Sequence, residues 1–362
     1  GSSAAATTST LELVTGDNNQ VYSASYTTGS WIGDLKAFAL NGDNGTISTT
    51  ATWSAQARLT ATSYTARNIY YRQPTTNALR TFDWTSLNAD GYGANFTGLC
   101  DTSVRTGVTQ CTSGLSDSEK TAANDGARLV NYLRGERTYE SANTGLGTTR
   151  ALYRARTGLL GDIINGAPRY VSKPNFEYND AGYGEFARTR SNRKPMLYVA
   201  ANDGMLHAIS ADSTDGSGGR EMWAYVPTAV MRNLYRLADS DYASKHRYFV
   251  DGAPVVGDVY VDGAWKTILI GGLGKGGRSY YALDITDPLS PRTLWEFNDD
   301  NLGLSYGNPV ITKRTDGSWV VVFASGYNNV TPGDGVGRLF VLNAYTGTRS
   351  RTDITKIGRA HV

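Results

Sequence analysis

The sequence has little of what common catalytic sites and membrane-spanning segments require. It contains only three histidines and two cysteines in 362 residues, and these are not clustered at the spacing of a zinc site. It has no Gly-x-Ser-x-Gly motif, which excludes the nucleophile elbow of α/β-hydrolases. The longest apolar run, Trp319 to Ala324, is far shorter than the ~20 residues that span a bilayer. The net charge of +2 gives no basis for a broad nucleic-acid-binding surface. We therefore expect no transmembrane segment and no nucleic-acid partner.

Glycine and tyrosine are abundant, with 41 and 23 copies. Together with frequent Thr and Val, they indicate many short strands joined by tight turns. Hydrophobic residues make up 40% and charged residues 19%, which is ordinary for a globular protein. The low-complexity start GSSAAATTST (1–10) predicts a linker over 1–15.

Two short helical insertions are expected in this β-rich chain. Ser116 and Glu119 form a capping box, and an apolar stripe follows, which predicts a helix from Ser116 to about Arg134, ending at Gly135. A second helix is expected to begin near Pro227. Its apolar face consists of Val230, Leu234 and Leu237.

A repeated pattern runs through the chain. Each copy has a Pro-led strand, a central apolar strand, a Gly-rich turn and a strand of the form aromatic/Leu-x-Ala/Leu-x-Asp/Asn. The clear copies lie at 167–227, 253–297 and 308–347 and begin at Pro168, Pro254 and Pro309. The first two end on Trp223 and Trp295. Weaker copies at 34–55 and 68–84 end on Trp53 and Trp84.

Four-stranded units with a period of about 40–50 residues predict a β-propeller, and a β-sandwich is the alternative. A Trp at a fixed place in each blade can pack against the next blade. We expect early blades over 16–150, with a helical insertion at about 116–135, and three blades over 151–356. The fold class predicted is therefore an all-β propeller.

The stretch GGLGKGGRSYYALDITDP (271–288) raises the question of a phosphate-binding loop. Such a loop leads from a strand into a helix. Here SYYALDI after the loop alternates with the period of a strand, and Lys275 is followed by Gly276 rather than Ser or Thr. Gly272, Gly274, Gly276 and Gly277 are therefore predicted to form a hairpin connection inside a blade.

Cys100 and Cys111 flank a short polar segment. They are either two free thiols or a disulfide, and we favour the disulfide. A disulfide would stabilise the fold by roughly 2–3 kcal/mol and would imply an oxidising compartment.

Of the histidines, we expect His207 to be packed or turn-facing and His246 to lie on the surface. Arg134-Gly135-Glu136 is RGE rather than the integrin-binding RGD, and Gly135 fits a helix C-cap. No catalytic residue is predicted.

From about Trp31 onward the chain resembles the C-terminal propeller of the PilY/PilC family of type IV pilus tip proteins. The resemblance rests on long motifs in the same order as in the family. These are LVNYLRGER (129–137), LLGDIINGAPRYV (159–171), ANDGMLHAIS (201–210), EMWAYVP (221–227), HRYFVDGAPVVGDVY (246–260) and 271–288. The resemblance implies a modified seven-bladed propeller, so the blades counted here make up an incomplete propeller. The resemblance also implies an exported, non-enzymatic protein at the pilus tip and outer membrane. It implies roles in pilus assembly, control of retraction, twitching motility and adhesion. Minor pilins and host-surface or matrix ligands are the implied partners.

The resemblance also implies a calcium site in the complete propeller, on an acidic loop spaced like an EF-hand. The corresponding place here is NAYTGTRSR (343–351), which lacks that loop. Asp- and Asn-rich stretches occur at 16–19, 41–45, 211–219 and 298–301. None has the ligand spacing of an EF-hand, so each is predicted to be a turn. We therefore expect no metal ligand and no cofactor within this fragment.

The last six residues, IGRAHV (357–362), back-translate to a sequence that resembles a common sequencing adapter. We expect 357–362 to be a non-native tail on a fragment, and the alternative is that they are a genuine tail.

Two other functions are alternatives to the role in the pilus. Quinone-dependent dehydrogenases have propellers with similar repeats, and ALDITDPLSPRTLW (282–295) is similar to them. Those enzymes often use a disulfide between adjacent cysteines, which Cys100 and Cys111 are not. The other rival is an outer-membrane propeller scaffold.

Overall fold

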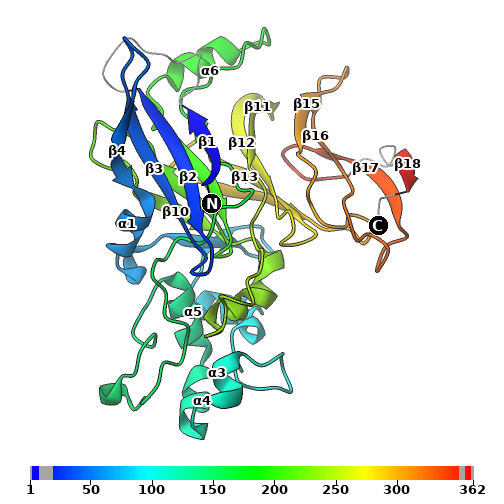
Figure 1. Cartoon of the computed structure of the whole chain (residues 1–362). Coiled ribbons are helices and arrows are strands. Elements are labelled where there is room, and N and C mark those ends of the chain that lie inside the picture. The colour runs from blue at the N-terminus through cyan, green and yellow to red at the C-terminus, as the bar shows by residue number, and fades with distance from the viewer. Residues whose placement is uncertain (1, 8–18, 350–354, 360–362) are drawn as a thin grey trace.

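A computed structural model describes residues 2–7, 19–349 and 355–359. Its strands form four separate sheets, and each sheet contains a four-stranded antiparallel unit; these units follow one another in chain order (Figure 1). We call them blades 1 to 4. The strand order within each blade is the chain order. The prediction of an all-β propeller fold is confirmed, and the four blades form an open arc rather than a closed ring.

The blades consist of short strands, as the Gly- and Tyr-rich composition predicts. Blade 1 consists of β1 (Ser2–Thr7), β2 (Gln20–Thr27), β3 (Ile32–Leu40) and β4 (Ile47–Ser54). Blade 2 consists of β7 (Arg169–Val171), β8 (Met196–Ala201), β9 (Met205–Ser210) and β10 (Glu221–Tyr225). Blade 3 consists of β11 (Val255–Val261), β12 (Ala264–Gly272), β13 (Tyr280–Asp284) and β14 (Arg292–Phe297). Blade 4 consists of β15 (Val310–Lys313), β16 (Trp319–Ala324), β17 (Val336–Asn343) and β18 (Thr355–Arg359).

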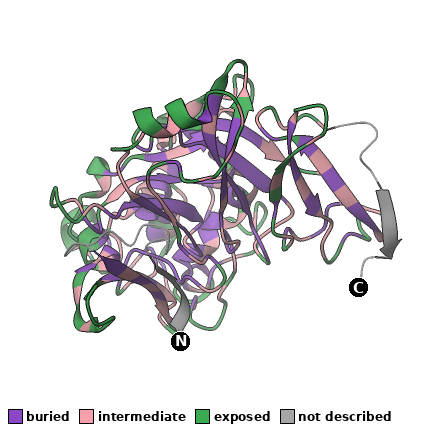
Figure 2. Ribbon diagram, turned by 90° about the horizontal axis from the view of Figure 1, so that it is seen from above, coloured by how far each residue is buried: buried purple, intermediate pink, exposed green. Residues whose placement is uncertain are grey.

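Burial differs between inner and outer blades. Every residue of β8, β9 and β13 is buried, because these strands have neighbouring elements on both faces. In β2 and β3 of blade 1, and over much of β17 in blade 4, buried positions alternate with less buried ones. This period of two is typical of a sheet that is covered on one face. Figure 2 shows the same concentration of buried residues in the inner strands.

The proline and Asp/Asn marks of the repeat have fixed places in the blades. Pro168, Pro254 and Pro309 directly precede the first strands β7, β11 and β15, where a missing N–H breaks no ladder hydrogen bond. The third strand of each blade is followed by, or ends in, an Asp or Asn whose side-chain oxygen accepts a backbone N–H two residues on. These residues are Asn41, Asp212, Asp284 and Asn343. The repeated pattern therefore consists of turn-forming residues as well as of apolar positions.

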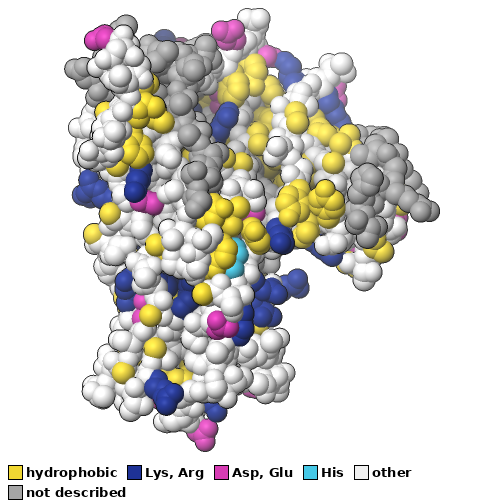
Figure 3. Space-filling model, in the orientation of Figure 1, with side chains coloured by type: hydrophobic (Ala, Val, Ile, Leu, Met, Phe, Trp, Pro, Cys, Tyr) yellow, Lys and Arg dark blue, Asp and Glu magenta, His cyan; other side chains and the backbone are white. Residues whose placement is uncertain are grey.

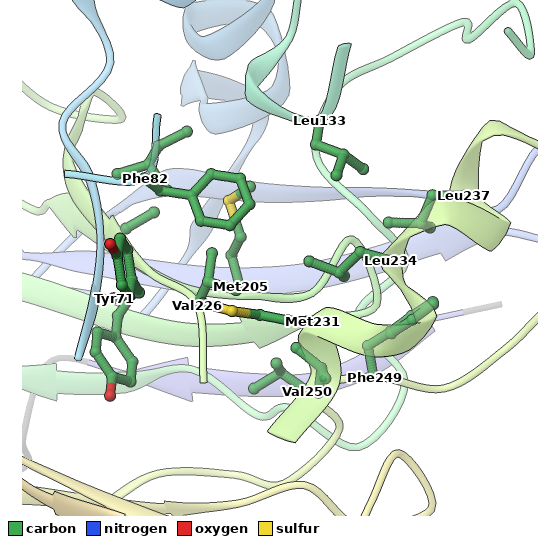
Figure 4. Packing of buried hydrophobic residues seen from close by; sticks show 14 of the residues in the cluster. Tyr71, Phe82, Leu133, Met205, Val226, Met231, Leu234, Leu237, Phe249 and Val250 are labelled. Atoms are coloured by element: carbon green, nitrogen blue, oxygen red, sulfur yellow. The ribbon is translucent and has the colours of Figure 1, made fainter. Parts of the chain in front are cut away.

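Between blades 1 and 2 the chain forms a mostly helical region with one hairpin. Its helices are α1 (Ala55–Thr60), η2 (Tyr64–Ala66), α2 (Trp84–Ala89), η3 (Gly93–Asn95), α3 (Thr109–Ser113), α4 (Asp117–Ala123), α5 (Gly126–Arg134) and η4 (Thr144–Leu146). Two later helices are α6 (Tyr183–Thr189) inside blade 2 and the 3₁₀ helix η5 (Thr228–Ala238) after it. The largest core cluster lies where this region meets blades 2 and 3. Figure 4 shows Phe82, Leu133, Met205 and Met231 converging there.

Helical content therefore exceeds the two insertions predicted. The helix predicted from Ser116 to Arg134 is two helices, because Asp125 accepts the N–H of Arg128 at 2.9 Å and caps a new one. A Cβ on Gly126 would lie 2.2 Å from the Trp84 ring, so only glycine fits there. The Ser116–Glu119 capping box and the Gly135 C-cap are present as predicted. η5 buries Val230, Leu234 and Leu237, also as predicted.

Two other expectations differ from the structure, and a third, the non-native tail over 357–362, stays a prediction. Ser2–Thr7, predicted within a linker over 1–15, form β1, because their backbone pairs with β2 despite the low-complexity side chains. Residues 8–18 lie outside the described residues. The possible copy at 68–84 is not a blade of its own. Its strands β5 (Ile69–Arg72) and β6 (Leu79–Thr81) extend blade 2, with β5 parallel to β10. The proposed tail begins inside β18, and 360–362 lie outside the described residues.

Candidate functional site

The predicted blade-packing tryptophans join consecutive blades. The Nε1 of Trp223 in blade 2 donates to the carbonyl of Pro288 in blade 3 at 2.7 Å. The Nε1 of Trp295 in blade 3 donates to the carbonyl of Ala344 in blade 4 at 3.0 Å. Trp53 in blade 1 packs on the turn after the third strand of blade 2. All three indoles lie in or beside the fourth strand and meet the turn between the third and fourth strands of the next blade. We call these contacts the tryptophan joints.

Glycines make two of the tryptophan joints close. A Cβ on Gly219 would lie 2.7 Å from Cε3 of Trp53, and a Cβ on Gly347 would lie 2.5 Å from Cγ of Trp295. Any larger residue at either position would push the blades apart. The indoles are at most 8% exposed, so each contributes a large buried apolar area to the interface.

The glycine-rich stretch connects β12 to β13, which pair antiparallel. Gly272 is the last residue of β12, and Gly274, Gly276 and Gly277 follow in the turn before Tyr280. The segment after the turn is a strand, so the stretch does not have the strand-to-helix geometry of a phosphate-binding loop. Gly276 packs tightly, since a Cβ there would lie 1.8 Å from the carbonyl oxygen of Phe249.

A buried ionic network connects the region between blades 1 and 2 with blade 2. His207 is fully buried, and its Nδ1 lies 2.7 Å from Oε2 of Glu221 while its Nε2 lies 3.1 Å from both oxygens of Asp203. Arg67 donates to both oxygens of the Glu221 carboxylate, at 2.8 and 2.9 Å. A further Arg67 nitrogen donates to the carbonyl of Arg134 at 2.6 Å. Two cations and two carboxylates thus share one site.

The charges of this network shift the pKa values in opposite directions. Burial by itself would lower the pKa of His207, but the carboxylates of Asp203 and Glu221 outweigh it and raise the pKa to about 9. Burial would raise the pKa of Glu221, but Arg67 and His207 outweigh it and lower the pKa to about 2. His207 is therefore a buried imidazolium at neutral pH, and it is packed as the sequence predicts.

Perturbed pKa values can mark an active site, but ion-pair networks that hold a fold together perturb them too. A cavity of about 30 Å³ lies beside Arg67 and Asp203. It is large enough for about two water molecules, not for a substrate. The network therefore joins α5, β9 and β10 through paired charges. No sequence motif marks Arg67, and the only signal for Asp203 was its place four residues before His207.

His246 is not on the surface, which corrects the prediction. Its side chain is 9% exposed, its Nε2 lies 3.0 Å from Asp162, and its ring stacks on Trp31 with centroids 3.8 Å apart. The run KHRY looked polar in sequence, but the tertiary structure brings Trp31 from blade 1 over the imidazole.

Arg134 of the RGE triplet is also buried. Its guanidinium donates to the carbonyls of Phe82, Tyr64 and Arg67. Gly135 ends α5 with a φ of 121°, as the predicted C-cap requires. Arg134 is therefore part of the core while Gly135 and Glu136 are half-buried, so the triplet is not an exposed recognition loop.

Cys100 and Cys111 form a disulfide in the helical region. In the described part of the chain, no group of three or more His, Cys, Asp and Glu side chains is arranged to hold a metal ion. The Asp- and Asn-rich turns at 41–45, 211–219 and 298–301 use their side-chain oxygens on neighbouring backbone N–H groups. The calcium loop implied by the resemblance thus has no fitting donor set among these residues. None of the helices in residues 2–7, 19–349 and 355–359 has the length and apolar character to cross a membrane.

Consecutive four-stranded blades held by tryptophan joints place the chain in the β-propeller class. Residues 160–359, more than half of the chain, match the family described as the PilY1 beta-propeller domain. The chain therefore belongs to the PilY1 β-propeller family, as its motifs predict.

Characterised relatives agree with this assignment. The chain is 32% identical over 335 residues to the type IV pilus biogenesis factor PilY1 of Pseudomonas aeruginosa strain PAK, covering 89% of this chain and 26% of that protein. It is 37% identical over 245 residues to a PilY1 homolog of Xylella fastidiosa, covering 65% of this chain and 19% of that protein. The chain thus spans about a quarter or less of these relatives. The crystal structure of the P. aeruginosa PilY1 C-terminal domain shares 32% identity, with a TM-score of 0.43 over 53% of this chain and 38% of that one.

Proposed function

We propose that the protein is a type IV pilus biogenesis factor that acts by binding rather than by catalysis. The observation that carries the proposal is the family match over blades 2 to 4, together with relatives named as type IV pilus biogenesis factors. The tryptophan joints support a scaffold role, because they fix neighbouring blades and leave the connecting loops as the variable surface. The Cys100–Cys111 disulfide fits an exported protein.

In this proposal the protein is located outside the cell, at the pilus tip and the outer membrane surface. It promotes assembly, opposes retraction and contributes to adhesion. Minor pilins are its partners at the tip, and host-surface or matrix molecules are its adhesion ligands. Calcium binds to the complete propeller, on a loop outside the residues described here.

The test is deletion of the gene in the bacterium that carries it, in backgrounds with and without the retraction ATPase. We expect the deletion to abolish surface pili and twitching when retraction is active, and pili to return when retraction is removed. Immunogold labelling should place the protein at pilus tips. Normal pili and twitching after deletion would refute the proposal. The intact full-length gene is the complementation control.

The rival dehydrogenase function has its own outcome. Purified protein supplied with calcium and a quinone cofactor should show no substrate-dependent reduction of a dye acceptor. Turnover under these conditions would contradict the binding role and support the rival.

A further inference from the structure

A basic recess lies between η5 and the glycine-rich turn of blade 3. Its volume is about 460 Å³, which is within the range of ligand-binding clefts. Its polar lining includes Asn95, Arg232, Asn233, Lys275, Arg278 and Asn298. These residues come from the helical region, from η5, from the β12–β13 turn and from the end of blade 3. Figure 3 shows Lys and Arg side chains gathered on one face between the sheets and the helical region.

No acidic residue lines the recess. In the part of the chain that the structure describes, Arg232, Lys275 and Arg278 form no ion pair. Lys275 and Arg278 have only neutral partners, since Nζ of Lys275 lies 4.8 Å from the Tyr248 ring centroid and Arg278 donates to the carbonyl of Thr331 at 2.8 Å. Arg232 and Lys275 are exposed.

One carboxylate that contacts the lining residue Thr228 is already engaged. Glu296 accepts the Tyr225 hydroxyl at 2.6 Å and the N–H of Thr228 at 2.9 Å, and it also accepts the Thr228 hydroxyl. It therefore reduces the local positive charge without pairing any of the three cations. The recess keeps a concentration of positive charge in a protein whose net charge is only +2.

The glycine-rich turn adds backbone donors. Among the described residues, the N–H groups of Lys275, Gly277 and Arg278 have no hydrogen-bond partner. Gly276 has no room for a side chain, because the turn packs on Phe249. The residues of this turn line the recess, so their backbone N–H groups lie beside the cations of Lys275 and Arg278. This arrangement is suited to carboxylate oxygens.

We propose that this recess binds an acidic peptide segment of a partner protein. Three cations, Arg232 from η5 and Lys275 and Arg278 from the β12–β13 turn, match carboxylates spaced along a chain rather than one compact ion. Asn95, Asn233 and Asn298 can both donate to and accept from peptide groups. No aromatic side chain lines the recess, so it offers no platform for stacking a sugar ring or a base. This site is independent of the pilus role proposed above.

The test measures binding of a fluorescein-labelled Asp/Glu-rich peptide to the full chain by fluorescence anisotropy. The matched neutral peptide has Asn and Gln in place of Asp and Glu. We expect the acidic peptide to bind and its neutral counterpart not to bind. The triple variant R232Q/K275Q/R278Q should weaken binding by about tenfold or more, and salt at about 0.15 M should weaken it too.

A charge-matched control separates the recess from net charge. R58Q/R169Q/R220Q removes three exposed cations outside the recess and should leave affinity nearly unchanged. Equal weakening by both triple variants would overturn the proposal, as would no binding of the acidic peptide. Recess-dependent binding of heparin or inorganic phosphate without binding of the peptide would also overturn it. The double variant R232Q/K275Q keeps the test valid if the Arg278 change disturbs folding, because both of its side chains are exposed.

The result can be separated from the pilus proposal. Peptide binding is measured on purified protein, and the pilus phenotype is measured in cells with the gene deleted. Failure of one measurement therefore leaves the other intact.

Discussion

The indole of Trp295 donates its N–H to the carbonyl of Ala344 at 3.0 Å, and this bond crosses from blade 3 to blade 4. The same ring lies over Gly347. One residue thus combines a buried hydrogen bond with the apolar contact that holds two sheets together.

Replacing Trp295 should therefore weaken the fold strongly. W295A should lower the free energy of unfolding by about 3–5 kcal/mol, because a large buried side chain leaves a cavity. W295F retains an aromatic ring but leaves the Ala344 carbonyl without its donor, so it should cost less, about 1–3 kcal/mol. Urea unfolding followed by circular dichroism measures both. Y327A, which truncates a side chain that is 54% exposed, is the control and should have little effect. Equal stability of W295A and Y327A would show that the joint does not hold the blades.

Stability should fall at alkaline pH through His207. Its pKa is raised from 6.5 to about 9 in the folded state, so its contribution is fully present below about pH 6.5 and is lost as the pH rises through about 9. The free energy of unfolding should be measured between these pH values for the wild type and for H207Q. The variant should be less stable at neutral pH and should lack most of the wild-type decline. An unchanged decline in H207Q would assign the alkaline effect to another group.

Glu221 should make the stability of the fold depend on pH in the acid range. Its pKa is lowered from 4.5 to about 2, so its contribution is present above about pH 4.5 and is lost as the pH falls through about 2. E221Q should remove the partner of both Arg67 and His207 and cost about 3–5 kcal/mol near neutral pH, since it leaves buried cations without a full counter-charge. E185Q is the matched control, because Glu185 pairs with Arg188 on the surface of α6. Similar losses in the two variants would contradict a special role for burial.

Reducing the Cys100–Cys111 disulfide should destabilise the helical region. The bridge closes a short loop, with a sequence separation of 11, and should contribute about 2–3 kcal/mol. Unfolding with and without dithiothreitol measures this. In C100S/C111S the reductant should have no effect, and the variant should match the reduced wild type. If the wild type is insensitive to reductant, the disulfide does not stabilise the fold.

Replacing Gly276 with any larger residue should lower the free energy of unfolding. G276A places a Cβ 1.8 Å from the Phe249 carbonyl oxygen, so the turn must shift, and a loss of about 1–3 kcal/mol is expected. G184A is the contrasting control. Gly184 lies inside α6 with open space around it, so alanine should leave stability unchanged or raise it by about 0.5–1 kcal/mol. Thermal unfolding distinguishes the two, and a tolerated G276A would show that the turn adapts easily.

Much of the architecture could be predicted, because it depends on local chemistry. Three local features of the blades recur at a fixed spacing in the sequence. These are a proline before the first strand, an Asx turn after the third strand and a Trp in the fourth strand. Pro254, Asp284 and Trp295 show all three marks in blade 3. The Ser116 capping box is equally local.

Contacts between distant segments could not be predicted in this way. The hairpin at 68–84 has the repeat's strand pattern and a terminal Trp, yet it extends blade 2, because β10 offers its edge to β5. Arg67 has no motif around it and meets Glu221 across 154 residues. His246 was predicted to lie on the surface because its neighbours in sequence are polar, but the Trp31 ring stacks on its imidazole in the folded chain.

The sequence by itself therefore determined that the chain forms β-propeller blades, where blades 2 and 3 begin and end, and to which family it belongs. The blades follow from hydrophobic periodicity and turn residues, which act over a few positions. The family follows from long motifs in the same order, such as 201–210 and 246–260. Only the tertiary structure decided which edges pair, which charges are buried together, and that Arg232, Lys275 and Arg278 share one recess. Those arrangements depend on the packing of segments far apart in the chain, which no local pattern specifies.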